Sequence, residues 1–404
     1  MKIQAQSSLL LRQALQKAAK CIDSKSTIAI FANVLLTQRK EDGKFFFVSA
    51  TTDSELSIPA PLSIVEGSFD ADVVLPITSL LPLLSTLPAD CVVTMDLSQD
   101  ENRSMSIEYC TQNGENVKKG NVSLVYFSAE DFPRAAQPDN ASLHISLPMA
   151  TFGNVLSHAG NFVGNSELRP IMNCLCIDVA EDRSEVIFVA TDGHALIKLI
   201  HTNNPETGGS NFFRSGTPGK ILVERTFFKP LAVFDDCEDI DIETNDSMVR
   251  FTSGDDITFV CKKVAGQYPN YNSVIPRNNP YKVTVDKREL TSVVKRVALF
   301  SDESSNMIAL KKDGMFLDIS AQDLDFNMSA NDQVLITDGT CPEGYRIGFK
   351  ASSMLNALAP IQSDTVCLHL GDPSRAGVIT ANESSPRALT LLVPMILDES
   401  TYIE

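Results

Sequence analysis

The feature of this 404-residue chain that most constrains its fold is a threefold internal repeat. In each third, a stretch with helical periodicity is followed by two strand-like runs joined by a turn, then by a strand, a short amphipathic helix and a hairpin. The first helical stretches are 7–22, 148–164 and 286–301, and the strand-helix stretches are 73–88, 220–234 and 346–360. Such a repeat indicates tandem copies of one fold. The sequence therefore predicts an α+β protein of three similar domains, each with two helices and mostly antiparallel sheet.

Two polar segments that contain proline mark the expected boundaries of these domains. Residues 132–142 carry two prolines, and residues 268–281 carry three together with many asparagines. This composition is typical of linkers. We therefore expect domains at 1–134, 142–268 and 279–404.

The charge of the chain restricts how it could hold a nucleic acid. There are 34 Lys and Arg residues against 51 Asp and Glu residues, which gives a formal net charge of −17. A protein that grips DNA by neutralising phosphates is normally basic, so the sequence argues against a groove reader. It leaves open a protein that holds nucleic acid by geometry.

Cysteine usage and hydropathy predict a reduced protein without metal, cofactor or membrane contact. The nine cysteines include no CxxC pair, so a zinc site is not expected. The apolar run at the N-terminus is too short for a signal peptide, and no window reaches the roughly 18 apolar residues of a membrane span. We expect a cytoplasmic location.

The stretch VATDGHAL, residues 189–196, places the Asp192 carboxylate two residues before the His194 imidazole. Asp192 could orient His194 as the general base of a hydrolase. However, the chain has neither a GxSxG nucleophile motif nor an HExxH metal motif. Aspartates also recur at matching places, Asp53 and Asp323, where no histidine follows. We therefore interpret Asp192 as part of a shared strand-to-turn feature and expect no enzymatic activity.

Three motifs together resemble one family. They are the TDGH of 191–194, the YPNY of 268–271 followed by the VIP of 274–276, and the C-terminal LLVPMIL of 391–397. With the threefold repeat, the chain resembles the β sliding clamp of bacterial DNA polymerase over its whole length. The resemblance implies a head-to-tail homodimeric ring that encircles duplex DNA without sequence preference. It also implies an ATP-driven clamp loader, and DNA polymerases and repair proteins that bind through short peptide motifs.

The resemblance places the partner-peptide cleft between the second and third domains. Its members are mostly apolar, with a few polar groups that could hold a peptide backbone. For the apolar members, packing in the core is the alternative interpretation. The residues at the matching positions are Arg169, Ile171, Met172, Thr191, Gly193, His194, Leu196, Pro269, Val274, Leu391, Val393, Pro394 and Met395.

Two further sets of residues follow from the resemblance. The DNA-facing candidates, for each of which an ordinary solvated surface is the alternative, are Lys17, Lys20, Lys25, Arg169, Arg288 and Lys295. The dimer-interface candidates are Val122 and Leu124 of one subunit against Leu299 and Phe300 of the other. Lys118 and Lys119 are expected to face acids such as Asp323 and Asp325, with the apolar four dominating because exposed ion pairs contribute little.

The chain departs from the commoner family pattern around the expected cleft. Ala195 and Ile396 stand where some members have Arg, and Lys350 and Ser353 stand where Asn and Tyr are frequent. We expect a less basic rim, and we expect the acidic tail 398–404 to lie near the cleft and modulate binding. A scaffold of the same fold that is not loaded on DNA is the second interpretation of function.

Overall fold

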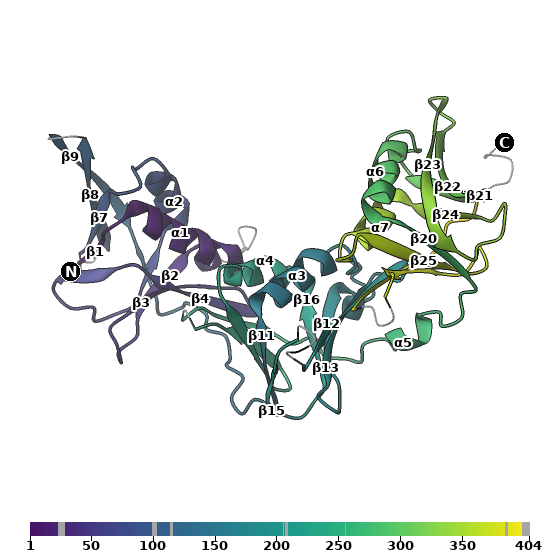
Figure 1. Ribbon diagram of the computed structural model, residues 1–404. Coiled ribbons are helices and arrows are strands. Elements are labelled where there is room, and N and C mark those ends of the chain that lie inside the picture. The colour runs from purple at the N-terminus through teal and green to yellow at the C-terminus, as the bar shows by residue number, and fades with distance from the viewer. Residues whose placement is uncertain are drawn as a thin grey trace. The chain divides into compact units, whose positions relative to one another are not determined.

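The computed structural model describes residues 1–22, 29–98, 103–113, 116–204, 206, 209–254, 256–383 and 387–397. Its contacts divide the chain into two compact units. The first unit consists of Met1–Ala150, Phe212–Thr217 and Thr226–Lys263, and the second consists of Thr151–Asn211, Pro218–Arg225 and Val264–Glu404. The middle repeat therefore contributes strands to both units (Figure 1).

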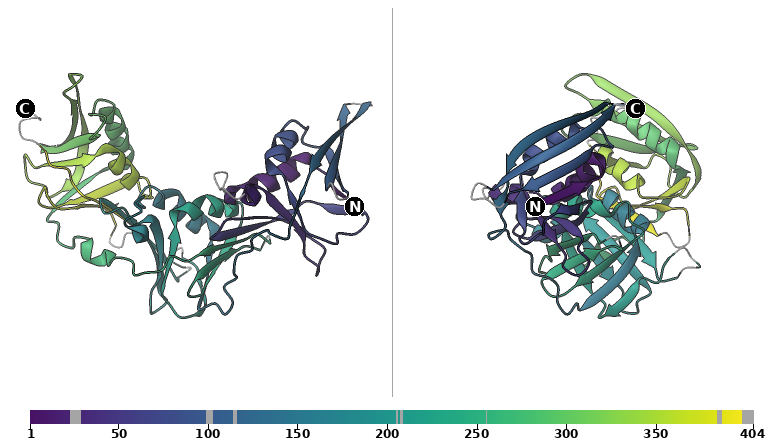
Figure 2. Two further views of the ribbon diagram at one scale, coloured as in Figure 1. Left: turned by 180° about the vertical axis from the view of Figure 1, so that it is seen from behind. Right: turned by 90° about the vertical axis from the view of Figure 1, so that its left-hand side faces the viewer.

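A five-stranded antiparallel sheet in the first unit has the order β5-β1-β7-β8-β9. Its strands are β1 (Lys2–Ala5), β5 (Ser63–Glu66), β7 (Val92–Leu97), β8 (Ser104–Asn113) and β9 (Asn116–Val125). Strands β8 and β9 form a long hairpin, visible in the right panel of Figure 2. Strand β9 is an edge of this sheet, so one side of its backbone is free to pair with another chain.

A ten-stranded sheet in the first unit has the order β10-β6-β2-β3-β4-β19-β18-β17-β11-β15. The strands from the first repeat are β2 (Val34–Gln38), β3 (Phe45–Ala50), β4 (Ser54–Ala60), β6 (Val73–Leu75) and β10 (Phe127–Ser128). Those from the middle repeat are β11 (Leu143–Pro148), β15 (Phe213–Gly216), β17 (Asp239–Thr244), β18 (Met248–Thr252) and β19 (Thr258–Lys262). The sheet crosses from one repeat to the next where β4 pairs with β19.

Two helices of the first repeat pack against each other and cover this sheet. Helix α1 (Ser8–Ala18) begins where the Ser7 hydroxyl accepts a hydrogen bond from the Leu10 amide, and it buries Leu11 and Leu15. It contacts α2 (Ile77–Ser85), β3 and β4. The middle repeat adds the short α4 (Phe228–Leu231) between 3-10 turns at 225–227 and 232–234.

The second unit holds a twelve-stranded sheet of order β16-β12-β13-β14-β27-β26-β25-β20-β23-β22-β21-β24. The strands from the middle repeat are β12 (Cys174–Val179), β13 (Glu185–Thr191), β14 (Ala195–Thr202) and β16 (Lys220–Glu224). The third repeat supplies β20 (Tyr281–Asp286), β21 (Met307–Asp313), β22 (Phe316–Asp323), β23 (Met328–Gly339), β24 (Arg346–Lys350), β25 (Thr365–Leu370), β26 (Gly377–Ala381) and β27 (Ala388–Leu392). The crossing between repeats is the pairing of β14 with β27.

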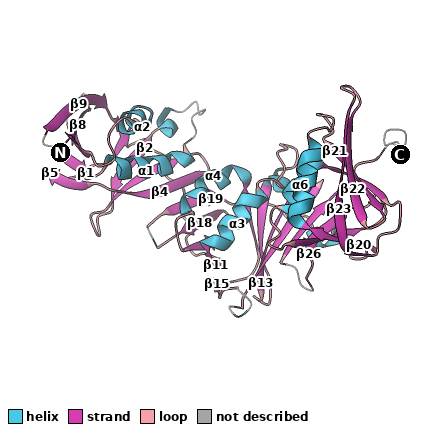
Figure 3. Ribbon diagram, turned by 45° about the horizontal axis from the view of Figure 1, so that its top comes forward, coloured by secondary structure: helices cyan, strands magenta, loops and turns pink. Residues whose placement is uncertain are grey.

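The helices of the second unit follow the predicted periodicity. Helix α6 (Lys287–Ala298) is capped by the Asp286 carboxylate, which accepts from the Glu289 amide at 2.8 Å. It packs against α7 (Ala351–Leu358), labelled beside it in Figure 1, and against β22 and β23, which Figure 3 shows next to it. The remaining helices are α3 (Met149–Ala159), whose first two residues belong to the first unit, a 3-10 turn at Pro170–Asn173, and α5 (Tyr271–Val274).

The strand registers confirm the repeat and correct one detail of it. Leu35 lies opposite Val48 and Val74, as Cys176 lies opposite Val189 and Leu222. Leu310 lies opposite Ile319 and Ile347 in the same way. The three aspartates do not occupy matching positions in the strand registers. The four-residue turns 51–54 and 192–195 make Thr51 equivalent to Asp192, whereas the third hairpin pairs as far as Asp323 and Met328.

Two classes of feature are absent from the described residues. None of their helices is long and apolar enough to cross a membrane. They also contain no group of three or more His, Cys, Asp or Glu side chains arranged to hold a metal ion.

Candidate functional site

The turn between β13 and β14 is built by side chains that bond to its own backbone. The Asp192 carboxylate accepts hydrogen bonds from the amides of His194 and Ala195, both at 2.8 Å. The Thr191 hydroxyl accepts from the Gly193 amide at 3.1 Å and donates to the Ala195 carbonyl at 2.8 Å. Gly193 has a φ of +92°, a conformation that L side chains rarely adopt. Asp192 therefore shapes the turn, with its carboxylate committed to backbone amides next to the exposed imidazole of His194.

The C-terminal strand brings the last predicted cleft residues beside this turn. Leu196 lies opposite Leu391 in the ladder, and the Val393 amide donates to the His194 carbonyl at 2.8 Å. The Met395 amide donates to the Gly348 carbonyl at 2.8 Å, which ties the segment to β24 of the third repeat. Residues far apart in sequence are thus held in one place by backbone hydrogen bonds.

Two further segments close around the turn. Arg169, which precedes the 3-10 turn of 170–173, and Met172, within it, lie against the site that a Cβ on Gly193 would occupy, with side-chain atoms 3.9 Å from it. The Tyr268 hydroxyl donates to the Val189 carbonyl at 3.4 Å. The apolar cluster beneath the site contains Cys174, Cys176, Ile187, Val189, Leu196, Leu222, Tyr268, Tyr271 and Leu391, with Ile171, Val264, Ile275, Ala376 and Leu389 packed against it.

Burial separates these residues into a floor and a rim. Thr191, Leu196 and Leu391 are buried, while Val274 is 57% exposed and Val393 is 43% exposed. Gly193, His194 and Pro269 are exposed, and Ile171, Met172, Pro394 and Met395 are half-buried. Exposed apolar side chains gathered over a buried apolar floor are typical of a surface that binds another protein. Ile396, which the sequence comparison had noted, is 94% exposed, and Leu168, next to Arg169 in the chain, is 92% exposed. The sequence analysis did not single out Leu168, because a single exposed apolar residue carries no periodic signal.

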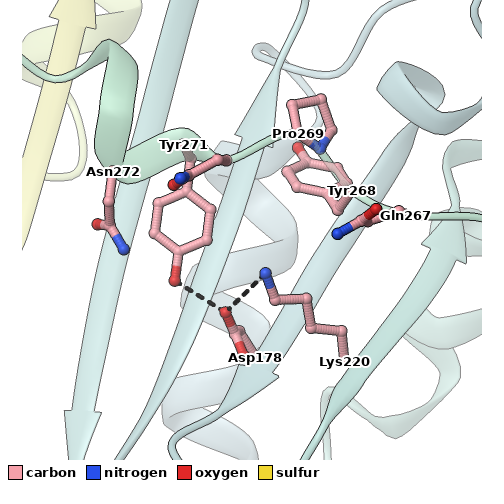
Figure 4. Close-up of a pocket in the computed structure, with 8 residues that line it drawn as sticks. Asp178, Lys220, Gln267, Tyr268, Pro269, Tyr271 and Asn272 are labelled. Atoms are coloured by element: carbon pink, nitrogen blue, oxygen red, sulfur yellow. Dashed lines mark hydrogen bonds and ion pairs between the residues drawn. The ribbon is translucent and has the colours of Figure 1, made fainter.

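A pocket of about 570 Å³ is lined by the 267–272 loop together with Asp178 and Lys220 (Figure 4). The Tyr271 hydroxyl donates to the Asp178 carboxylate at 2.9 Å, and the Lys220 ammonium lies 3.4 Å from the same carboxylate. Burial, with Asp178 nearby, raises the pKa of Tyr271, so the phenol keeps its proton and remains a donor. Pro269 lines this pocket and is also a predicted cleft residue.

The predicted DNA-facing residues differ in whether their charged groups already have a partner within the chain. The Lys17 ammonium lies 3.0 Å from the Asp236 carboxylate, and Lys20 donates to the Ala232 carbonyl at 2.9 Å. Arg288 makes an exposed 3.7 Å pair with Asp364, and Lys295 is exposed with no ion pair among the described residues. Arg169 is exposed at the rim of the site. The remaining candidate, Lys25, lies outside the described residues.

The predicted dimer-interface residues occupy two free surfaces. Leu299 is 76% exposed and Phe300 is 40% exposed at the end of α6, while Val122 and Leu124 are half-buried on the edge strand β9. The structure adds exposed apolar residues that the sequence did not single out: Val125, Phe127, Leu324, Phe326 and Met328.

The expected ionic contacts of this interface need correction. The Asp323 carboxylate is buried and accepts hydrogen bonds from the amides of Asp325 and Phe326, so it is not free to face Lys118 or Lys119 of another chain. Asp325 is exposed, as is Lys119, whereas the side chain of Lys118 lies outside the described part of the protein. The acidic tail 398–404 also lies outside it.

Comparison with known proteins identifies the family. Models described as the N-terminal and the C-terminal domain of the DNA polymerase III beta subunit match residues 1–136 and 272–395, together more than half of the chain. The beta sliding clamp of Caulobacter vibrioides is 24% identical over 402 residues, which cover 98% of this chain and 100% of the relative. That of Bacillus subtilis is 24% identical over 404 residues, covering 97% and 98% respectively.

Solved structures agree on the fold. The sliding clamp of Pseudomonas aeruginosa bound to griselimycin superposes with a TM-score of 0.82 at 21% identity, covering 98% of this chain and 100% of that one. The sliding clamp of Bacillus subtilis superposes with a TM-score of 0.83 at 19% identity and the same coverage. The predicted α+β fold class and the resemblance are therefore confirmed: the chain belongs to the DNA polymerase III β-subunit family of sliding clamps.

Proposed function

We propose that this protein is a DNA sliding clamp, a ring that encloses duplex DNA and tethers DNA polymerases and repair proteins to it. The observation that carries the proposal is the convergence of residues 169–172, 191–196, 268–274 and 391–395 on one apolar surface at the β14–β27 crossing. Family membership supports the same role. Partners would insert apolar side chains over Leu196 and Leu391, between the exposed Val274 and Val393.

The ring would close by pairing two copies of the chain head to tail. Strand β9 offers a free edge, and β23 pairs with β22 alone along residues 328–335. Exposed apolar side chains accompany each edge, with Phe127 near one and Leu299, Phe300 and Met328 near the other. A free strand edge with adjacent apolar surface is suited to pairing between chains. We also retain domains at 1–134, 142–268 and 279–404 as a proposal.

Enclosure is consistent with the charge of the chain. With a net charge of −17, most of the surface repels DNA, so retention would rest on topology and a small number of cations such as Arg288 and Lys295. Helix α3 adds little, because burial lowers the pKa of His158, the basic side chain in its last turn, and Lys287 lowers it further. Weak phosphate contacts would allow sliding.

The proposal assigns no catalytic step to Asp192 and His194. The two hydrogen bonds of the Asp192 carboxylate go to backbone amides, which is the arrangement of a turn. We further infer a cytoplasmic location, since that is where a clamp loader and duplex DNA would meet this protein in a bacterial cell.

A loading assay tests the function. The protein is loaded by a clamp loader and ATP onto nicked circular DNA, and half of the sample is then linearised. A clamp stays on the circle and runs off the linear form, whereas a scaffold of the same fold is retained on neither. Retention on both forms would indicate ordinary DNA binding and would contradict enclosure. The Phe300→Ala variant, analysed for solution mass, tests the ring interface separately.

A further inference from the structure

A pocket of about 450 Å³ lies at the β4–β19 crossing of the first unit. Thr37, Ser57 and Thr258 line it, and their half-buried side chains have hydroxyls without a hydrogen-bond partner among the described residues. Phe46 and Val48 also line it, and both are buried. The pocket therefore combines an apolar part with hydroxyl groups that can bond to a ligand.

The strand registers show what occupies the equivalent place at the β14–β27 crossing. Thr37 stands in its ladder where Asp178 stands in the other one. Ser57 likewise stands where Lys198 stands. Tyr271 contacts both of these counterparts: its hydroxyl donates to Asp178 at 2.9 Å (Figure 4), and its ring centre lies 5.6 Å from the Lys198 ammonium. The pocket of the first unit therefore corresponds to the place that a tyrosine ring fills in the second.

The two linkers explain why this place is open in the first unit. Each linker has an aromatic residue followed by proline, and the aromatic residue, Phe132 or Tyr268, is buried in the apolar cluster of its own crossing. Two residues after the proline, the second linker has Tyr271 and the first has Ala135. A methyl group thus stands where the other crossing has a phenol ring.

The charged groups that line the pocket already have partners. Arg39 Nη1 lies 3.1 Å from the Asp256 carboxylate, and Arg134 Nε lies 3.0 Å from that of Glu55. An ionic ligand would have to compete with these pairs, whereas a neutral hydroxyl can bond to threonine or serine without disturbing them. The Ala135 amide also donates to Glu55, at 2.9 Å, so the chain's own linker is bonded across this crossing. A small molecule therefore suits the pocket better than a peptide segment.

We propose that this pocket binds a small neutral phenol, with its ring against Phe46 and its hydroxyl bonded to Thr37 or Ser57. The ligand would take the place that Tyr271 takes in the second unit, and it would hold the first linker against the sheet. Its binding depends neither on ring closure nor on peptide docking. A ligand of about eight non-hydrogen atoms can reach a Kd of about 1 mM in such a site.

The test uses 4-fluorophenol and fluorobenzene, which differ by the hydroxyl, and follows their binding to the full-length protein by fluorine NMR. The wild-type protein is expected to bind 4-fluorophenol with a Kd of about 1 mM and fluorobenzene at least about fivefold more weakly. The Ala135→Tyr variant supplies a ring of its own, so it should lose 4-fluorophenol binding and unfold about 2 °C higher. The matched control Ala136→Tyr, at an exposed position, should keep wild-type binding and melting temperature.

A second variant keeps the test decisive if Ala135→Tyr does not fold. Thr37→Val combined with Ser57→Ala removes both hydroxyls and should weaken 4-fluorophenol binding at least about fivefold, with fluorobenzene unaffected. Equal binding of the two compounds by the wild type would overturn the proposed preference for a phenol. Undiminished 4-fluorophenol binding by a folded Ala135→Tyr variant would place the ligand elsewhere. Displacement by the peptide Gly-Gly-Tyr-Gly-Gly would show that a tyrosine of another chain, and not a free phenol, is the ligand.

Discussion

The first crossing between repeats pairs β4 with β19, and the second pairs β14 with β27. The two crossings share one strand register and carry chemically different side chains. Glu55 pairs with Val260 in the first crossing as Leu196 pairs with Leu391 in the second. The Glu55 carboxylate is buried and accepts from Arg134 Nε at 3.0 Å, Arg134 Nη2 at 3.2 Å and the Ala135 amide at 2.9 Å. At the first crossing, therefore, Arg134 and Ala135 of the chain's own linker are bonded to Glu55. The equivalent position in the second crossing is the buried, apolar Leu196.

The rims of the two crossings differ in the same sense. The Lys262 amide donates to the Asp53 carbonyl at 2.8 Å, which is the same bond that Val393 makes with His194. At the first crossing these two side chains form an ion pair at 3.6 Å, and at the second they are an exposed valine and an imidazole. The same backbone arrangement therefore carries an ion pair at the first crossing and an exposed valine beside an exposed histidine at the second. Under the proposed function, side chains, and not the fold, would restrict partner docking to the second crossing.

Moving the carboxylate of the first crossing into the second should have the largest effect. The Leu196→Glu variant places a carboxylate in the buried apolar cluster, where no arginine is bonded over Leu196 as Arg134 is bonded over Glu55. Losing the apolar contacts and leaving the charge unpaired should cost about 4 kcal/mol of unfolding free energy. Urea denaturation measures the loss, and the matched control Leu196→Met should lie within about 1 kcal/mol of wild type. A small loss in Leu196→Glu would mean that water reaches this position more readily than the 2% exposure of the Leu196 side chain indicates.

Removing the arginine from the first crossing tests the other half of the comparison. Arg134 is about half exposed, so its loss leaves Glu55 partly rehydrated and still bonded to Ala135. We expect the Arg134→Leu variant to lose about 2 kcal/mol of unfolding free energy. Adding Glu55→Gln should recover part of that loss, because a neutral amide tolerates burial better than a carboxylate. An absence of recovery would show that Arg134 acts by packing alone.

Much of the fold could be predicted from the sequence, because hydrophobic periodicity is a local signal. The helix expected at 286–301 is α6, with Leu290, Val293, Val294 and Val297 buried as the pattern indicated. The segment 268–281, expected as a linker, instead buries Tyr268 and Tyr271 in the second crossing. Its proline and asparagine content is typical of a loop, and composition does not reveal that a loop is anchored.

The candidate site was predictable only as far as the family motifs reach. The motifs named Thr191, Leu196 and Val393, which the structure brings together, whereas their role in binding stays a prediction. The contacts of Asp178 with Tyr271 and Lys220 could not be predicted from the sequence. These residues lie on β12, α5 and β16, which are far apart in the chain and are brought together only by the folded sheet. The repeat alignment failed at Asp53 for a related reason. The strand register makes Thr51, and not Asp53, the equivalent of Asp192, and a shared letter in the sequence does not reveal the register.

The turn glycine offers a smaller test of the second crossing. A methyl group on Gly193 would meet its nearest neighbours, Arg169 and Met172, at 3.9 Å, so space is not limiting. The cost of Gly193→Ala comes instead from the φ of +92° and should be about 1 kcal/mol. Thermal denaturation measures it, with Gly219→Ala as the control, since a Cβ there meets no atom within 4 Å and its φ is not in the left-handed region. Equal losses in both variants would rule out turn strain as the cause.

The smallest effect on stability is expected from exchanging the rims. The double variant Val393→Lys with His194→Asp gives the second crossing the ion pair of the first, on side chains that are already exposed. Exposed pairs contribute little, so the unfolding free energy should stay within about 0.5 kcal/mol of wild type. Peptide affinity should nevertheless fall at least about tenfold, because an apolar anchor would have to desolvate the new charges.

The reverse exchange, Lys262→Val with Asp53→His, should not create peptide binding at the first crossing, since the Glu55–Arg134 pair still occupies the position of the apolar floor. Binding gained by that reverse variant would mean that the rim alone separates the two crossings.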